Sequence, residues 1–344
     1  MVMAEVGAFQ RREVGTRTAA RSNLARLLPP LVGGLAVLLA LIGLIGTAIR
    51  DPKPHDIPVG LVGPVPAVHN ISASFGSAAP GAFKFTSYDS ESAARAALDQ
   101  RSVDGVLVLG SGTPRLILAG ASGDGSTGVI TGAFTKAFQA QGAALTVETV
   151  HAFPAGDSHG LVLFFVVVAV LISTLVAQAL LGVGSEAGFG ARFLVAVLYG
   201  AVAGVAGMAS AAWIAGGYGS GFWTAAALMA LASTAVGAVV AGSIRLLGGA
   251  GLGLAALVVV LFDLVSSGGP AGSQLLPDFY RWLAPWMPAG ELYSGLRGAL
   301  FFDGAGLGLP LAVLTGWLLG GLALMLLGEL AATRRRSLPA APAQ

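Results

Sequence analysis

Cysteine is absent from the 344 residues of this chain. Disulfide bonds and thiolate metal sites are therefore excluded. Charge is scarce as well, because only 10% of the residues are Asp, Glu, Lys or Arg, against roughly 25% in soluble domains. Hydrophobic residues make up 55% of the chain, and the mean hydropathy is +0.80. This composition predicts an integral membrane protein in a lipid bilayer, and the net charge of +2 gives no indication of a nucleic-acid partner.

Lysine occurs only at Lys53, Lys84 and Lys136. A phosphate-binding loop needs Gly-Lys followed by Ser or Thr, so that backbone amides and the ammonium group surround the phosphates. The three lysines follow Pro, Phe and Thr, which excludes ATP binding through such a loop. If the protein moves a substrate, a partner or an ion gradient must supply the energy.

Long apolar runs dominate the chain. A helix needs about 20 mostly apolar residues to cross a hydrocarbon core of roughly 30 Å. Six segments meet this requirement, at residues 31–49, 160–182, 193–215, 222–244, 246–265 and 309–331. The sequence therefore predicts an α-helical membrane protein with six transmembrane helices. The first is followed by a long polar stretch, and the other five form a transmembrane domain at 159–333.

Arginines beside the predicted helices indicate the orientation, because basic residues are retained on the cytoplasmic side of a membrane. With the N-terminus inside, ten of the nineteen Lys and Arg residues are cytoplasmic: Arg11, Arg12, Arg17, Arg21, Arg26, Arg192, Arg245, Arg334, Arg335 and Arg336. This predicts a multi-pass plasma-membrane protein with a cytoplasmic N-terminal segment (1–30) and tail (334–344). A cleaved signal peptide is the alternative for the N-terminus, but its apolar core of about 19 residues exceeds the usual 7–15.

Residues 50–158 are predicted to form an extracytoplasmic α/β domain between the first and second transmembrane helices. Short apolar runs bounded by Gly, Pro or polar residues predict strands at 57–63, 83–88, 103–110, 114–120 and 144–150. A 3.6-residue apolar period predicts helices at 90–101 and 126–142. We expect a structural or substrate-guiding domain.

We expect no enzyme activity, metal or cofactor in this chain. Asp157, Ser158 and His159 are catalytic-triad residue types, but three consecutive side chains diverge and cannot form a chain of hydrogen bonds. The four histidines are scattered, without a close carboxylate or a helical i, i+4 partner. The sequence GSGTPR (110–115) lacks the third glycine of a dinucleotide-binding loop.

Two pairs of glycines at four-residue spacing, Gly200 with Gly204 and Gly316 with Gly320, lie in predicted transmembrane helices. Small residues at this spacing let helix backbones approach closely in lipid. They indicate packing inside the helix bundle or, for one pair, a dimer face.

Three sequences carry a resemblance to a known family. They are RDPKPHDIPVGLVGP (50–64), YDSESAARAALDQRSVDGVLVL (88–109) and SSGGPAGSQLLPDFYRWLAPWMPAGELYSGLRG (266–298). Together with the order of one helix, a large polar domain and five helices, they resemble permease subunits of ABC-2-type exporters, closest to the phage-infection-protein-like branch. The resemblance implies a homo- or heterodimer that moves an amphipathic or lipid-like substrate outward. The alternative is a membrane scaffold that does not transport, whose extracytoplasmic domain binds an envelope protein or polymer.

The resemblance also implies a separate ATP-binding subunit on the cytoplasmic face. Its contacts are expected at the basic N-terminal segment and at the loop GVGSEAGFGAR (182–192). Glu186 and Arg192 in this loop are the candidate residues for coupling to ATP hydrolysis.

The third sequence is rich in helix breakers, with Pro270, Pro277, Pro285 and Pro288. In the related permeases, the corresponding segment is a broken, partly re-entrant helical pair at the outer leaflet. Non-helical backbone at membrane depth persists only where it is buried in protein or lines a wet cavity. The segment 270–303 is therefore predicted to be re-entrant or, alternatively, an interfacial loop.

Three charged residues are candidates for a gate or substrate path: Asp263, Glu291 and Arg297. A charge inside a membrane helix is costly and usually functional. Asp263 is expected to reach water or a partner such as Arg281 or Arg297, or to serve as a coupling carboxylate or gate. Glu291 and Arg297, six residues apart on one helical segment, are expected to face water or substrate.

Overall fold

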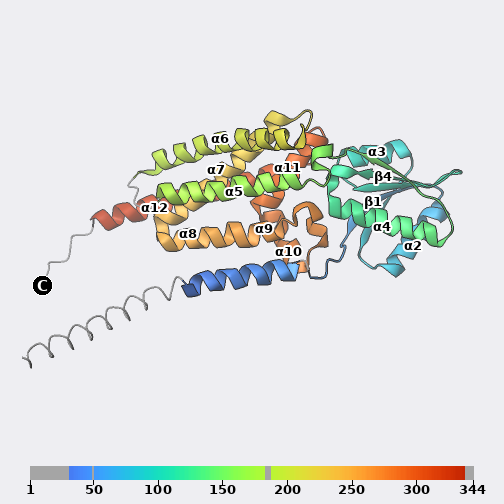
Figure 1. Ribbon diagram of the computed structural model, residues 1–344, viewed down its shortest axis with the longest axis horizontal. Helices are drawn as coiled ribbons and strands as arrows, with labels where there is room; N and C mark the ends of the chain where they lie inside the picture. Colours follow the sequence, from blue (N-terminus) through green and yellow to red (C-terminus); the bar gives the residue numbers. More distant parts are fainter. Residues whose placement is uncertain (1–30, 49, 183–186, 338–344) are drawn as a thin grey trace, which may run out of the picture. The chain divides into compact units, whose positions relative to one another are not determined.

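The protein is described by a computed structural model that covers residues 31–48, 50–182 and 187–337 (Figure 1). The chain divides into two compact units, Met1–Arg50 and Asp51–Gln344. The first unit contains the apolar helix Leu31–Ala48. The second unit contains an α/β domain followed by a bundle of helices.

Five strands form one mixed sheet in the order β2-β1-β3-β4-β5. They are β1 (Ile57–Val62), β2 (Phe83–Tyr88), β3 (Gly105–Val108), β4 (Arg115–Ala119) and β5 (Thr146–Val150). β1 runs parallel to β2 and β3, β3 is antiparallel to β4, and β4 is parallel to β5. All five predicted strands are confirmed, with ends that differ by a few residues.

Helices cover both faces of this sheet. α3 (Glu91–Asp99) and α4 (Asp124–Ala140) correspond to the predicted helices, and the Ser90 hydroxyl caps α3 by accepting from the amide of Ala93 at 3.2 Å. A third helix, α2 (Val65–Ala78), was not predicted. Its sequence contains Asn, Ser and β-branched residues, which favour helices weakly. Burial of the Phe75 ring, 4.6 Å from Phe134 of α4, stabilises it through tertiary packing.

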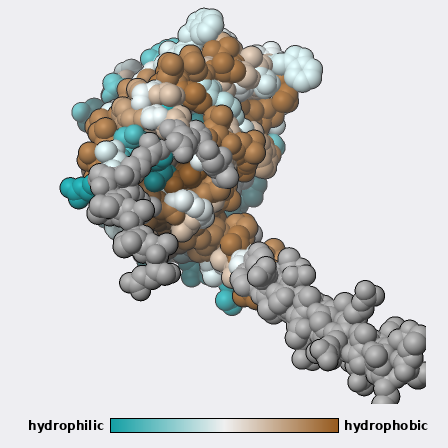
Figure 2. All heavy atoms as spheres, turned by 90° about the vertical axis from the view of Figure 1, so that its left-hand side faces the viewer, coloured by the Kyte–Doolittle hydropathy of each residue, from teal (hydrophilic) through white to brown (hydrophobic). Residues whose placement is uncertain are grey.

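The bundle consists of long apolar helices. They are α5 (Leu161–Gly182), α6 (Phe189–Ala215), α7 (Phe222–Leu247), the composite helix Gly249–Ala271 and α12 (Gly308–Ser337). With Leu31–Ala48, the described residues thus include six helices long and apolar enough to cross a membrane. Hydrophobic residues cover much of the face shown in Figure 2. These features are consistent with a multi-pass membrane protein.

The composite helix is irregular. It starts as α8 (Gly249–Ala256), continues as a π-helical segment, η3 (Leu257–Asp263), and ends in α9 (Leu264–Ser266) and η4 (Gly269–Ala271). π-Helical turns inside helices often occur at functional sites. This turn ends at Asp263, one of the candidate residues.

Glycines allow α6 to lie close to α7. A Cβ atom added at Gly204 would lie 2.7 Å from the amide nitrogen of Ala230, and one at Gly200 would lie 2.8 Å from the Ala230 carbonyl oxygen. Bundle packing is therefore confirmed for this pair. Gly316 and Gly320 of α12 differ, because no described atom outside the local helix lies within 4 Å of a Cβ added there.

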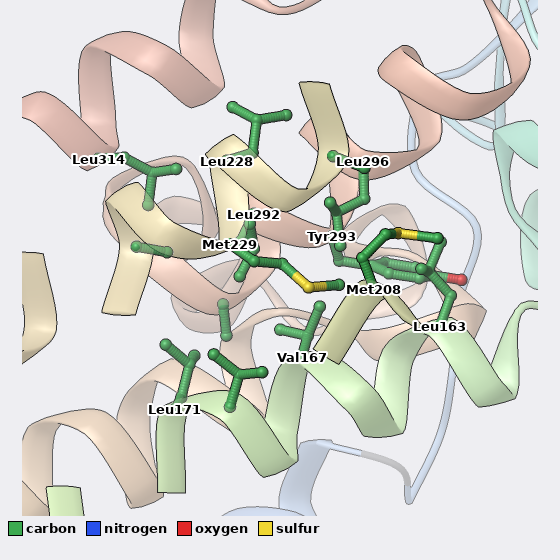
Figure 3. Packing of buried hydrophobic residues seen from close by; sticks show 14 of the residues in the cluster. Leu163, Val167, Leu171, Met208, Leu228, Met229, Leu292, Tyr293, Leu296 and Leu314 are labelled. Atoms are coloured by element: carbon green, nitrogen blue, oxygen red, sulfur yellow. The ribbon is translucent and has the colours of Figure 1, made fainter. Parts of the chain in front are cut away.

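The residues between Ser266 and Gly308 fold into a broken hairpin, which we call the proline hairpin (269–301). It contains η4, η5 (Ser273–Leu275), α10 (Asp278–Leu283), η6 (Ala284–Trp286) and α11 (Pro288–Phe301). Most side chains of α11 are buried. Figure 3 shows Tyr293 of α11 among Leu163 and Val167 of α5, Met208 of α6 and Met229 of α7. α11 is therefore part of the bundle core.

Two contacts give the course of the proline hairpin. The Trp286 carbonyl, just before α11, accepts a hydrogen bond of 2.8 Å from Trp317 Nε1, about two turns into α12. At the other end of α11, Ala299 lies against Gly221, where α7 begins. The hairpin therefore enters the bundle and returns to the end that contacts the α/β domain.

Candidate functional site

A polar cavity of about 330 Å³ lies between the α/β domain and the proline hairpin. Its charged side chains are Arg101 and Asp104 from the α/β domain and Glu291 and Arg297 from α11. Its hydroxyl side chains are Ser122, Ser267, Ser273, Tyr293 and Ser294. The volume falls within the range of about 300–1,000 Å³ found for small-molecule sites. We call it the junction cavity.

Arg101 directly follows Gln100, the C-cap of α3, and its side chain lines the junction cavity. Its Nη1 and Nη2 atoms donate hydrogen bonds of 3.0 Å to the carbonyl oxygen and the hydroxyl of Ser294. The guanidinium also lies 5.3 Å from the centre of the Phe302 ring. Burial and, to a smaller extent, the charge of Arg297 lower the pKa of Arg101 to about 10. The side chain stays protonated at neutral pH.

The backbone of Arg101 has a φ of 58°, in the left-handed region. Glycine usually occupies this position after a helix, because a Cβ atom costs about 1–2 kcal/mol there. The side chain is accommodated by a close approach to α11, since a Cβ atom at Gly298 would lie 3.0 Å from Arg101 Nη1. Such strain is often found at functional sites.

Arg297 extends from α11 in the opposite direction. Its Nη1 atom donates to the carbonyl oxygens of Ser122 and Ala121, the latter at 3.4 Å. The guanidinium lies 4.8 Å from the centre of the Tyr293 ring, in cation–π geometry. Each arginine is thus held by main-chain carbonyls of the opposite part of the chain.

Two carboxylates line the same cavity. Asp104 is only 8% exposed, and burial raises its pKa against the opposing effects of Arg297, Ser122 and Ser126. Burial also raises the pKa of Glu291 to about 7, against the charges of Arg101 and Arg297. Among the described residues, neither arginine lies within 4.0 Å of a carboxylate. The four charged groups therefore share a cavity without pairing with one another.

Asp263 has a different environment from the other two candidates. It is completely buried, and its Oδ1 atom accepts a hydrogen bond of 2.7 Å from the Ala289 amide in the first turn of α11. The expected partners are wrong: Arg281 pairs with Asp278 at 2.7 Å, and Arg297 bonds the carbonyls described above. Asp263 therefore caps a helix N-terminus, where a negative charge is favourable.

Asp157, Ser158 and His159 do not form a triad. Asp157 accepts hydrogen bonds from the amides of Val162 and Leu163 and from the Tyr218 hydroxyl, so that it caps α5. His159 instead contacts Asp124 at 2.9 Å. Within residues 31–48, 50–182 and 187–337, no three His, Asp or Glu side chains lie close enough together to hold a metal ion.

Of the two candidate coupling residues, the structure describes only Arg192, which lies at the other end of the bundle. Glu186 is outside the described residues. Arg192, in the first turn of α6, donates a hydrogen bond of 2.8 Å from Nε to the Ala187 carbonyl. Arg245 and Glu329 form an ion pair of 3.3 Å between α7 and α12.

The sequence did not identify Arg101, Asp104 or Ser294 as site residues. Arg101 is the last residue of the predicted helix 90–101 and Asp104 is the second residue of the predicted strand 103–110, so both were assigned to secondary structure and not to a site. Their separation from α11 by about 190 residues leaves no local pattern that joins them to Glu291 and Arg297. The only local signal for a site was the presence of two charged residues, Arg101 and Asp104, three positions apart in RSVDG.

Comparisons with protein-family models, with curated proteins and with solved structures found no match to this chain.

Proposed function

We propose that this chain is a permease-like subunit of an ABC-2-type exporter, which moves an amphipathic or lipid-like substrate outward across the plasma membrane. It works as a dimer with a separate ATP-binding subunit. In this proposal both termini are cytoplasmic, and the α/β domain lies outside and above the proline hairpin.

One observation carries the proposal: the proline hairpin enters the apolar bundle and presents charged side chains to a polar cavity. Broken backbone and charge are costly in a bilayer unless protein surrounds them or they line a wet cavity. A gate that passes a polar headgroup needs both a wet cavity and an element that moves separately from the long helices.

The partner is tested by purifying the chain from native membranes in a mild detergent. We expect stoichiometric recovery of an ATP-binding subunit, and ATP hydrolysis that added membrane lipid stimulates. Recovery of envelope proteins alone, without such a subunit, contradicts the proposal and supports the scaffold function.

The gate is tested by locking the proline hairpin with a disulfide, since the chain has no other cysteine. A Cβ atom at Gly290 would lie 3.5 Å from Ser267 Cβ, within the disulfide range. In the Gly290→Cys/Ser267→Cys variant, oxidation should lower lipid-stimulated ATP hydrolysis at least tenfold, and a reductant should restore it. The matched control, Gly237→Cys/Ala196→Cys with a Cβ separation of 3.6 Å, links α7 to α6 and should retain activity. Equal activity in the oxidised and reduced hairpin variant would refute the gate.

A further inference from the structure

The junction cavity is lined by buried polar atoms that make no hydrogen bond of normal geometry with any described residue, although the Ser122 and Ser126 hydroxyls lie near enough to Asp104 to lower its pKa. Within the described part of the chain, Asp104 Oδ2, Ser122 Oγ and Arg297 Nε have no hydrogen bond of normal geometry, and all three residues line the cavity. An unpaired buried polar group costs about 1–3 kcal/mol, and more when it is charged. A cavity that keeps several such groups is complementary to a guest that supplies both donors and acceptors.

The charges in the cavity are held apart by the fold. Main-chain carbonyls and the Ser294 hydroxyl bind the arginines, whose charges act on Asp104 and Glu291 without a direct ion pair among the described residues. Charged groups that share a buried cavity normally pair, because unpaired burial is strongly unfavourable. In this cavity, the two guanidinium groups and the two carboxylates can each bind a different part of a ligand.

A ligand with a single charge interacts favourably with only two of the four charged groups. A simple anion bound to Arg101 and Arg297 places negative charge beside the Asp104 carboxylate, and a simple cation leaves both arginines without a counter-ion. We propose that the junction cavity binds a zwitterionic group, with a phosphate or carboxylate held by Arg101 and Arg297 and an ammonium held by Asp104 and Glu291. This inference rests on the proposed function, since it identifies the polar headgroup of the transported substrate.

Apolar residues of the bundle complete the cavity. Ala284 and the first turn of α12, at Leu309 and Pro310, line it beside the charged groups. Leu309 is 52% exposed, and in the proposed membrane setting an exposed apolar side chain at this position is available to contact lipid. A headgroup in the cavity can therefore continue into an acyl chain along α12. This arrangement indicates an aminophospholipid as the source of the zwitterion, with a soluble phosphoamine as the other source of the same chemistry.

The binding test uses the delipidated full chain in detergent and isothermal titration, so that it needs neither transport nor ATP hydrolysis. The probes are phosphatidylethanolamine, phosphatidic acid and phosphatidylcholine with identical acyl chains. Phosphatidic acid lacks the ammonium, and the methylated ammonium of phosphatidylcholine cannot donate a hydrogen bond to Asp104. We expect phosphatidylethanolamine to bind at least tenfold more tightly than either. Equal affinity for phosphatidylethanolamine and phosphatidic acid, or no binding of phosphatidylethanolamine, overturns the proposal.

Substitutions assign the two ends of the site. Asp104→Asn and Arg297→Gln should each weaken phosphatidylethanolamine binding about tenfold, whereas Asp104→Asn should leave phosphatidic acid binding unchanged or tighter. Arg115→Gln is the matched control, because Arg115 pairs with Glu91 on the α/β domain and does not line the cavity. Unchanged phosphatidylethanolamine affinity in Asp104→Asn overturns the assignment, even if Arg297→Gln fails to fold.

A soluble probe distinguishes the two sources. Glycerophosphoethanolamine has the same zwitterion without acyl chains, and we expect it to bind at least tenfold more weakly than the lipid. Equal affinity for glycerophosphoethanolamine and phosphatidylethanolamine contradicts a lipid as the ligand. In that case, the comparison with phosphatidic acid still decides whether the cavity is specific for a zwitterion. If phosphatidylethanolamine does not bind but an ATP-binding subunit is recovered, this inference is rejected and the proposed function is not. If phosphatidylethanolamine binds but no ATP-binding subunit is recovered, only the proposed function is rejected.

Discussion

Arg101 donates hydrogen bonds of 3.0 Å to both the carbonyl oxygen and the hydroxyl of Ser294. These two bonds join the end of α3 to the middle of α11, across 193 positions of sequence. Bonds from a charged donor contribute more than neutral ones, at about 1.5–3 kcal/mol each. The α/β domain and the proline hairpin are therefore expected to respond together to changes at either residue.

The Arg101 backbone allows the side-chain contribution to be separated from the backbone strain. Arg101→Ala should lower the free energy of unfolding by about 2–3 kcal/mol, because the bonds to Ser294 are lost. Arg101→Gly loses the same bonds but relieves the left-handed strain, so it should be about 1 kcal/mol more stable than Arg101→Ala. The measurement is unfolding by SDS titration in mild-detergent micelles. A glycine variant less stable than the alanine variant contradicts the strain argument.

Asp263 is expected to act as a helix cap. Asp263→Ala removes the acceptor for the Ala289 amide and should cost about 1–2 kcal/mol of unfolding free energy. Asp263→Asn keeps an oxygen acceptor at the same place and should be nearly as stable as the parent protein. Both stability and lipid-stimulated ATP hydrolysis are measured for each variant. Loss of hydrolysis in a stable Asp263→Asn protein would show that the ionised carboxylate has a further role.

Glu291 makes stability depend on pH. Its pKa rises from 4.5 in the unfolded reference to about 7 in the fold, so the folded state binds the proton more tightly. The contribution of Glu291 to stability is therefore fully present below pH 4.5 and is lost as the pH rises through about 7, by roughly 1–3 kcal/mol. The raised pKa of Asp104 adds a slope of the same sign. Unfolding is measured from pH 4.5 to 7.5 without added lipid, and Glu291→Gln should show a shallower slope. Parallel curves for the two proteins would exclude Glu291 as the source.

The two glycine pairs should respond oppositely to alanine. Gly204→Ala places a Cβ atom 2.7 Å from the Ala230 amide nitrogen, and such overpacking should cost about 1–3 kcal/mol. Gly320→Ala meets no described atom within 4 Å and should stabilise the helix by up to about 1 kcal/mol. Unfolding and chemical cross-linking are measured in native membranes. A loss of cross-linked dimer in Gly320→Ala, without loss of stability, would identify this face of α12 as the dimer contact.

The predicted orientation is tested by labelling with a membrane-impermeant thiol reagent. A cysteine at Ser111, exposed in the turn between β3 and β4, should react in intact cells. A cysteine at Ser337 should react only after lysis, because basic residues beside it favour the cytoplasmic side. Labelling of Ser337→Cys before lysis, with protection of Ser111→Cys, would invert the topology.

The membrane class, the six apolar helices and the five strands could be predicted from the sequence. Each depends on a local pattern, either a run of about 20 apolar residues or a short apolar run between turn residues. The helix α2 was missed because its residues favour a helix weakly, and its stability depends on the contact of Phe75 with Phe134. Gly200 and Gly204 predicted close packing, but the identity of α7 as the partner required the structure.

The candidate site is mostly a result of tertiary structure. Glu291 and Arg297 were noticed because charge is rare in apolar sequence, which is a property of the sequence alone. Their association with Arg101 and Asp104 arises where the end of α3 meets the proline hairpin, and no sequence period connects residues so far apart. Asp263 had the same sequence signal as Glu291, yet its environment is a helix N-terminus and not the cavity. A charged residue in an apolar sequence indicates a free-energy cost of burial. Only the tertiary structure decides whether a backbone amide, a counter-ion or a ligand offsets that cost.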